Sequence, residues 1–182
     1  RARARGFAAT EVQINETETP LHRLETVYRR LVEHLGTADT ASGAFRGVID
    51  GWFYALEQDV LADSSVDPDD AAELLARTDA LMEARLSTIS KTAPAFSAVL
   101  RTYRRALAAG DGMLADGLIS WLSGQPNVAA SVKRAAGIKG DLDHFGATNF
   151  LVGLLTILRD SGFPGLVMVL DEVETLQRMR TD

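Results

Sequence analysis

Two adjacent carboxylates, Asp171 and Glu172, follow an apolar run, Leu166–Leu170, that begins just after the turn residues Gly162–Gly165. A short apolar run bounded by Gly and Pro is typical of a strand buried on both faces of a parallel sheet. Ligand sites of open α/β sheets lie at the carboxyl ends of such strands. Two acids at this point suit phosphoryl transfer, because one can help to hold Mg²⁺ and the other can polarise the attacking water. The pattern is that of a Walker B strand.

The phosphate-binding counterpart of such a strand does not occur in this chain. No G-x-x-x-x-G-K-[ST] motif is found in the 182 residues, and the nearest approach, Gly137–Gly140, has the wrong spacing. We therefore expect the phosphate-binding half of the site to lie outside this chain, which does not begin with Met and is predicted to be a piece of a longer protein. The alternative is a plain strand-to-helix junction, in which Asp171 and Glu172 only cap the next helix.

Composition and charge narrow the possible functions. A hydrophobic content of 46% and a charged content of 24% are those of an ordinary globular domain with one core, or one core and a small annex. No apolar run is long enough to span a membrane, and the lack of cysteine fits a reducing compartment, so a cytoplasmic location is expected. The net charge is −6, and acidic residues outnumber basic ones between residues 31 and 100. The charge therefore does not support nucleic-acid binding, and we interpret Arg1, Arg3 and Arg5 as a solvated tail.

The remaining elements are mostly helical. Residues 6–15 alternate enough to predict a strand, and Thr19 and Pro20 predict the N-cap and first residue of a helix that ends at Gly36. Asp67–Asp70 repeats this signal for a helix that continues to Ser90. Further helices are predicted over residues 42–61, 94–110, 113–122, 128–136 and 141–160, the last of them buried over much of its circumference.

The order strand, many helices, strand predicts a mostly helical α/β fold. A parallel crossover needs a dozen or more residues, usually one helix. The interval between the strands is far longer, so we predict that residues 40–138 form an inserted helical subdomain.

Several segments together resemble a known family. They are Pro20–Arg23, Val27–Leu31, Trp121–Gly124, Gly137–Ile138, Gly162–Leu166 and Leu170–Leu176. They resemble the P-loop domain family of unknown function that includes AAA+-like ATP-binding proteins of bacterial phage-defence islands of the BREX and phage-growth-limitation type. The resemblance covers nearly the whole chain and is most specific at its C-terminal end.

The resemblance implies a fold and a chemistry. Residues 1–39 and 139–182 would be parts of a P-loop NTPase core, with the second strand and the Walker B strand side by side. Asp171 would lie on the Mg²⁺ side of bound ATP, acting through a metal-bound water, and Glu172 would be the catalytic residue that orients the attacking water. The parent protein would be a Mg²⁺-dependent ATPase that drives a defence assembly, with protein partners or self-assembly. The chain lacks the family's Walker A strand and its sensor strand, so in isolation it is expected to bind ATP poorly and to be inactive.

Other candidates are weaker. The alternative function is a non-catalytic helical regulatory or protein-interaction module with a degenerate nucleotide site.

An arginine cluster on one predicted helix could provide an arginine finger or a partner contact, although a solvated face is the preferred interpretation; its members are Arg101, Arg104 and Arg105. Three polar residues at a helix start are interpreted as an acidic first turn and not as a metal site; they are Asp141, Asp143 and His144. His22 and His34 are too far apart for shared ligation, Glu174 is predicted to be a surface residue, and Gly137–Gly140 a helix stop. The aromatic residues Trp52–Tyr54 and Trp121 are predicted to lie in the core or an interface.

Overall fold

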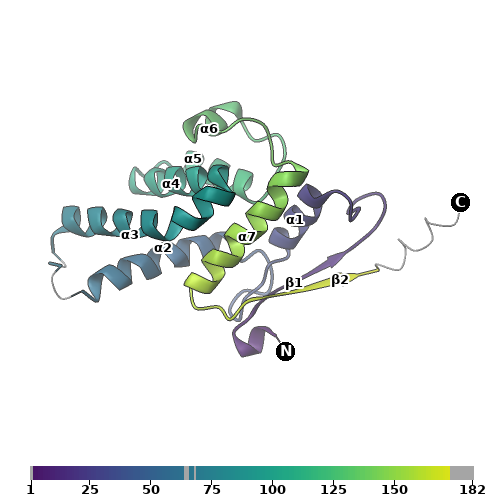
Figure 1. Ribbon diagram of the computed structural model, residues 1–182, viewed down its shortest axis with the longest axis horizontal. Helices are drawn as coiled ribbons and strands as arrows, with labels where there is room; N and C mark the ends of the chain where they lie inside the picture. The colour runs from purple at the N-terminus through teal and green to yellow at the C-terminus, as the bar shows by residue number, and fades with distance from the viewer. Residues whose placement is uncertain (1, 64–65, 68, 173–182) are drawn as a thin grey trace, which may run out of the picture.

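The computed structural model describes residues 2–63, 66–67 and 69–172, which form a strand pair and a group of packed helices (Figure 1). The elements are a short 3₁₀ helix Arg3–Arg5, β1 Ala8–Gln13, α1 Leu24–Glu33, α2 Phe45–Leu61, α3 Ala71–Thr92, α4 Pro94–Ala108, α5 Gly112–Leu122, α6 Ala130–Ala135, α7 His144–Asp160 and β2 Leu166–Asp171. The predicted mostly helical α/β class is confirmed.

The two strands pair in parallel although they come from opposite ends of the chain. Ala8 lies opposite Leu166, and the register continues to Gln13 opposite Asp171. The helices lie on one side of the pair in Figure 1. The side-by-side arrangement that the family resemblance implies is therefore present.

The burial of β2 differs from the prediction. Alternate residues of β1 (Ala8, Thr10 and Val12) are buried, as expected for a strand with helices against one face. In β2, the residues from Val167 to Leu170 are 36–48% exposed, so the prediction of a strand buried on both faces is wrong for this structure. The physical reason is that, within the described residues, β2 has a strand neighbour on one side only and β1 takes the contacts with α1.

One continuous hydrophobic core joins the helices to the start of β1, which contributes Ala8. At its centre, the ring of Phe150 on α7 packs edge-on against three other rings, Tyr28 at 5.9 Å, Phe96 at 5.2 Å and Trp121 at 5.5 Å. These four aromatic residues come from four different helices. A β-carbon at Gly153 would lie 3.0 Å from the Phe96 ring, so this glycine lets α7 approach α4 closely. The core therefore depends on contacts between distant parts of the sequence.

The outcome for the predicted buried residues is mixed. Trp52, Phe53 and Trp121 are buried as predicted, whereas Tyr54 is 65% exposed. On α7 the face that carries Phe150 is buried, but Phe145 is 82% and Val152 46% exposed. The apolar surface of α7 is thus wider than the face that the core covers.

The first helix begins later than Thr19 and Pro20 predict. Asn15 Oδ1 accepts hydrogen bonds from the backbone N–H groups of Thr17 and Glu18, at 3.1 and 2.6 Å, and from that of Thr19 at 3.3 Å. This turn uses the local donors and leaves Thr19 paired with Asn15, so α1 starts at Leu24 without a side-chain cap. Its end also differs, because Gly36 pairs with Ala9 beside the sheet and α1 stops at Glu33.

The start of α3 shifts in the same direction. Asp70, and not Asp67, is the N-cap: its side chain accepts from the backbone N–H groups of Ala72 and Glu73 at 3.1 and 3.0 Å.

At the N-terminus, the interpretation of a solvated tail is wrong for Arg3, whose guanidinium donates to the carbonyl of Ala41 at 2.7 Å. The predicted helices over 42–61, 94–110, 113–122, 128–136 and 141–160 are confirmed with small changes at their ends.

Among the helices of the described residues, none is both long enough and apolar enough to cross a lipid bilayer.

Candidate functional site

The carboxyl ends of β1 and β2 meet at one edge of the strand pair (Figure 1). Gln13 lies opposite Asp171, and the backbone N–H of Ile14 donates to the Asp171 carbonyl at 3.0 Å. The parallel ladder therefore continues to the first of the two candidate carboxylates. This is the position at which open α/β sheets place ligands.

A small second core fixes this edge. Ile14 is fully buried, and it packs with Val12 of β1 and with Val27 and Leu31 of α1, covered in part by Leu21. The Ile14 side chain is held by this cluster while its backbone holds Asp171. The position of Asp171 thus depends on apolar residues that were not among the predicted site residues.

Asp171 and Glu172 are both exposed, and β2 ends at Asp171. Asp171 Oδ1 accepts a hydrogen bond from the backbone N–H of Glu172 at 2.8 Å. Glu172 has φ of 60°, in the left-handed region that residues other than glycine rarely adopt. Left-handed residues of this kind occur preferentially at functional sites, where the surrounding structure holds them. The two carboxylates therefore stand at the end of β2, the second of them on a residue in the left-handed conformation.

The residues present fit a Mg²⁺ ion that is bound mainly by water and phosphate. Such an ion takes one or two protein carboxylates and keeps several waters. Asp171 offers one exposed carboxylate whose Oδ2 accepts no hydrogen bond among the described residues. In the part of the chain that the structure describes, no three His, Asp or Glu side chains converge on one point. An all-protein cage is therefore absent there, whereas a water-mediated contact is compatible with the geometry.

Polar residues that the sequence did not single out lie next to the carboxylates. Gln13 and Glu11 share the outer face of the sheet with Asp171, because parallel partners in register point to the same face. A hollow of about 420 Å³ lies between β1 and the end of α1, and its lining includes Glu11, Gln13, Arg30 and His34. Arg30 also forms a 3.0 Å ion pair with Glu33. The only sequence signal for Glu11 and Gln13 was the predicted strand over residues 6–15, which contains them both.

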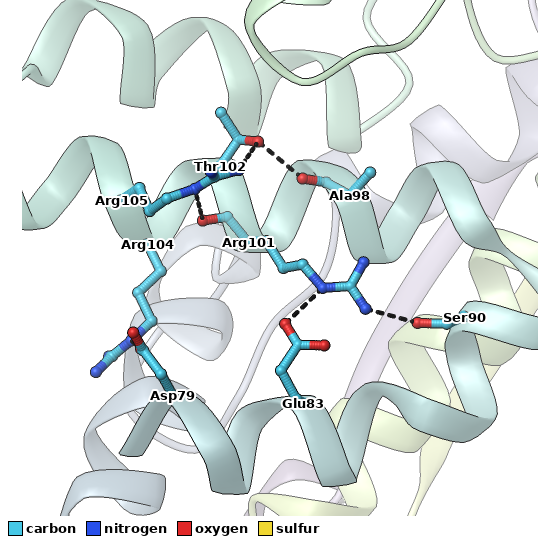
Figure 2. A network of polar contacts seen from close by, with 8 residues as sticks. All are labelled: Asp79, Glu83, Ser90, Ala98, Arg101, Thr102, Arg104 and Arg105. Carbon is cyan, nitrogen blue, oxygen red and sulfur yellow. Dashed lines mark hydrogen bonds and ion pairs between the residues drawn. The ribbon is translucent and has the colours of Figure 1, made fainter. Parts of the chain in front are cut away.

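The arginine cluster is part of the contact between α3 and α4 (Figure 2). Arg101 donates from Nε to Glu83 at 2.6 Å and from Nη2 to Ser90 at 3.0 Å. Arg104 donates to Asp79 at 2.7 Å and lies over the ring of Phe53. The interpretation as a solvated face is therefore wrong for these two arginines, because both bridge neighbouring helices.

Arg105 is the exposed member of the cluster. Its guanidinium donates to the Arg101 carbonyl at 3.4 Å and to the Thr102 hydroxyl at 3.3 Å, both on its own helix (Figure 2). In Figure 1, α3 and α4 lie away from the strand ends. The structure thus does not bring the arginine cluster to the carboxylates of the same chain.

The other polar candidates also stay apart. The Asp143 side chain caps α7 by accepting from the backbone N–H of Gly146 at 2.7 Å, so the helix begins at His144 and not at about Asp141, and its first turn holds no acidic residue. Asp141 accepts from Lys133 and from the backbone of Asn127, so it does not face the same point as Asp143. His22 and His34 are both exposed, at opposite ends of the α1 region. Glu174, and the resemblance segment beyond Glu172, lie outside the described residues.

The family comparison covers the whole chain. The family model of the BREX system ATP-binding proteins BrxC/D matches residues 1–182. No curated protein and no solved structure matched the chain. The match includes both strands and all the helices described above, as well as the Asp171–Glu172 edge. The chain therefore belongs to the family of BREX system ATP-binding proteins BrxC/D.

Proposed function

We propose that this chain carries the Walker B half of a Mg²⁺-dependent ATPase site. The observation that carries the proposal is the parallel pairing of β1 and β2, which brings Asp171 and Glu172 to the carboxyl edge of the sheet. The left-handed conformation of Glu172 gives further support, because such residues occur preferentially at functional sites. The family description, ATP-binding protein of the BREX system, supports ATP as the ligand.

The two carboxylates would have different roles. The Asp171 carboxylate would hold Mg²⁺ through a bound water, and the Glu172 carboxylate would orient the water that attacks the γ-phosphate. When bound, the ion would neutralise part of the negative charge of the phosphates. Ile14 and the small core beneath it act as positioning residues, because they fix the backbone of Asp171.

The exposure of β2 supports a larger sheet in the complete site. Val167–Leu170 have the composition of an interior parallel strand and yet are exposed. We infer that a further strand of the P-loop core pairs with the second edge of β2. We also infer that the phosphate-binding loop is supplied from outside residues 1–182. In this arrangement residues 1–39 and 139–182 belong to the ATPase core, and residues 40–138 are a helical insertion that transmits the nucleotide state to a defence assembly.

The test is ATP hydrolysis by the full-length protein with Mg²⁺ and with EDTA, in wild type and in Glu172→Gln. We expect Mg²⁺-dependent turnover that falls by about 10²-fold or more in Glu172→Gln, because a water-orienting carboxylate typically contributes that much, while nucleotide binding is retained. Glu57→Gln is the matched control, since Glu57 lies on α2, forms no hydrogen bond or ion pair among the described residues, and should leave turnover unchanged. Equal turnover in Glu172→Gln and wild type, or no nucleotide binding by either, would contradict the proposal and favour a non-catalytic helical interaction module.

A further inference from the structure

The edge of β1 that faces away from β2 is only partly paired. Along a strand of a parallel pair, alternate residues direct their backbone N–H and C=O groups to the neighbouring strand. The N–H of Ala8 donates to the Gly165 carbonyl at 3.2 Å. At the other end of the strand, the N–H of Ile14 donates to the Asp171 carbonyl at 3.0 Å. The even-numbered residues of β1 therefore face β2, and the odd-numbered residues direct their backbone groups to the opposite edge, which we call the free edge of β1.

Both ends of the free edge are already occupied by antiparallel pairing. At one end, Ala9 and Gly36 exchange two backbone hydrogen bonds, of 2.9 and 2.8 Å. At the other end, the N–H of Asn15 donates to the Thr19 carbonyl at 3.3 Å. Residues 11–13 lie between these ends, and within the described part of the chain no backbone hydrogen bond reaches them from this side. The free edge thus has a gap with antiparallel neighbours on both sides of it.

A hollow of about 420 Å³ lies along this gap. Its lining includes residues 11–13 on the side of the strand and Arg30 and His34 on the side of α1, and Glu18 lines it from the turn at one end. We call this hollow the edge slot. At a rise of about 3.3 Å per residue, its unpaired part accepts about three residues of an extended chain.

The uncompensated charge that lines the edge slot includes two carboxylates. Among the described residues, the side chains of Glu11 and Glu18 form no hydrogen bond or ion pair. The charge of Arg30 is already compensated by a 3.0 Å ion pair with Glu33. An extended segment with lysine side chains would therefore complement the slot, because opposite charges on neighbouring strands attract.

We propose that the edge slot binds an extended, lysine-bearing segment of a partner protein, which adds to β1 as an antiparallel strand. Its backbone exchanges hydrogen bonds with Glu11 and Gln13, whose N–H and C=O groups point into the slot. The lysine opposite Glu11 pairs with that carboxylate, and a second lysine, opposite Gln13, lies toward the end that carries Glu18. The direction follows from the pairing of Thr19 and Gly36, which is antiparallel at both ends. The proposal does not rest on the ATPase chemistry.

The experiment is fluorescence anisotropy of a labelled probe peptide, acetyl-Thr-Lys-Thr-Lys-Thr-amide, titrated with the full-length protein at low salt. The matched control peptide carries a methyl group on the backbone nitrogen of each lysine, so that it loses two N–H donors and keeps its charge. We expect saturable binding of the probe, and a dissociation constant about tenfold higher or more for the methylated peptide. Equal binding of the two peptides would overturn the proposal, since charge alone would then explain it.

Two charge reversals of equal size test the position on the protein. Glu11→Lys should weaken binding of the probe about tenfold or more, because it places a cation opposite a lysine. Glu16→Lys, at an exposed position that does not line the slot, should bind the probe as wild type does. Equal binding by Glu11→Lys and wild type, or no saturable binding up to about 1 mM, would overturn the proposal. Self-association of the protein that Glu11→Lys abolishes, measured by sedimentation velocity, would also overturn it, because a second copy would then occupy the slot.

Discussion

The helices and the strand pair differ in how far they bury their large apolar side chains. The helices gather theirs into one core in which Phe150 touches three other aromatic rings. The strand pair buries one face of β1 and leaves four apolar residues of β2 exposed beside the candidate carboxylates. The region that carries the proposed chemistry is therefore the one whose packing is incomplete among the described residues, whereas the helices are packed by contacts between their own residues.

The largest expected effect is at the centre of the helical core. Phe150→Ala should lower the free energy of unfolding by about 3–5 kcal/mol, because it removes a buried ring and leaves a cavity. Phe145→Ala, on the same helix but 82% exposed, should change it by less than about 0.5 kcal/mol. Urea unfolding measures both. Similar losses for the two variants would contradict the described position of α7.

A second pair of variants tests the difference between the two strands. Val12→Thr places a hydroxyl in the buried face of β1 and should cost about 2 kcal/mol. Val169→Thr keeps the β-branched shape at a site that is 48% exposed, and should cost less than about 0.5 kcal/mol. Urea unfolding of the chain gives the comparison. If the further strand of the proposed larger sheet is present in the full-length protein, Val169→Thr should become more costly there.

Much of the helical part could be predicted, and the failures have identifiable local causes. Regular apolar spacing located the helices, since a buried stripe needs that spacing whichever neighbour covers it. The start of α1 was predicted wrongly because the Asn15 side chain accepts hydrogen bonds from the next backbone N–H groups. These bonds form a turn at the place where Thr19 and Pro20 predict the start of a helix. The N-cap of α3 is Asp70 and not Asp67. The sequence could not decide between them, because each is an Asp that could serve as the N-cap.

The site could be predicted in part. The acids Asp171 and Glu172 were predicted as site residues from their place after an apolar run, and the parallel pairing was predicted from the family resemblance. The exposure of β2, the left-handed turn at Glu172 and the contact through Ile14 could not be predicted, because each depends on which residues meet in three dimensions. The same holds for Arg101 and Arg104, whose partners are on α3.

A smaller effect is expected for the carboxylate that joins α7 to α2 and α3. Asp160 accepts from the Trp52 indole at 2.6 Å and from Arg85 at 2.7 Å, and its side chain is only 17% exposed. Asp160→Asn should cost about 1–2 kcal/mol, as hydrogen bonds to a partly buried charge do. Asp59→Asn, which removes an exposed 3.6 Å contact with the same arginine, should cost less than about 0.5 kcal/mol. Thermal unfolding that ranks the two variants equally would contradict this assignment.

The smallest effect is a dependence on pH at the α6 loop. Hydrogen bonds from Lys133 and from the backbone of Asn127 hold the pKa of Asp141 below its usual range. A carboxyl whose pKa is lower in the folded state stabilises that state above its unfolded pKa of about 3.9, and the contribution is lost as the pH falls through the folded pKa. The stability difference between wild type and Asp141→Asn should therefore be present at neutral pH and shrink in acid. Asp39→Asn, an exposed control, should show no such trend.

The most direct test of the central claim is the binding of Mn²⁺, as a paramagnetic substitute for Mg²⁺, to the full-length protein with ATP, followed by electron paramagnetic resonance. We expect Asp171→Asn to weaken Mn²⁺ binding about tenfold or more, because it removes the charge that would face the ion. Glu172→Gln should keep Mn²⁺ binding while it loses turnover. Equal Mn²⁺ binding by wild type and Asp171→Asn would contradict the placement of the metal at this strand end.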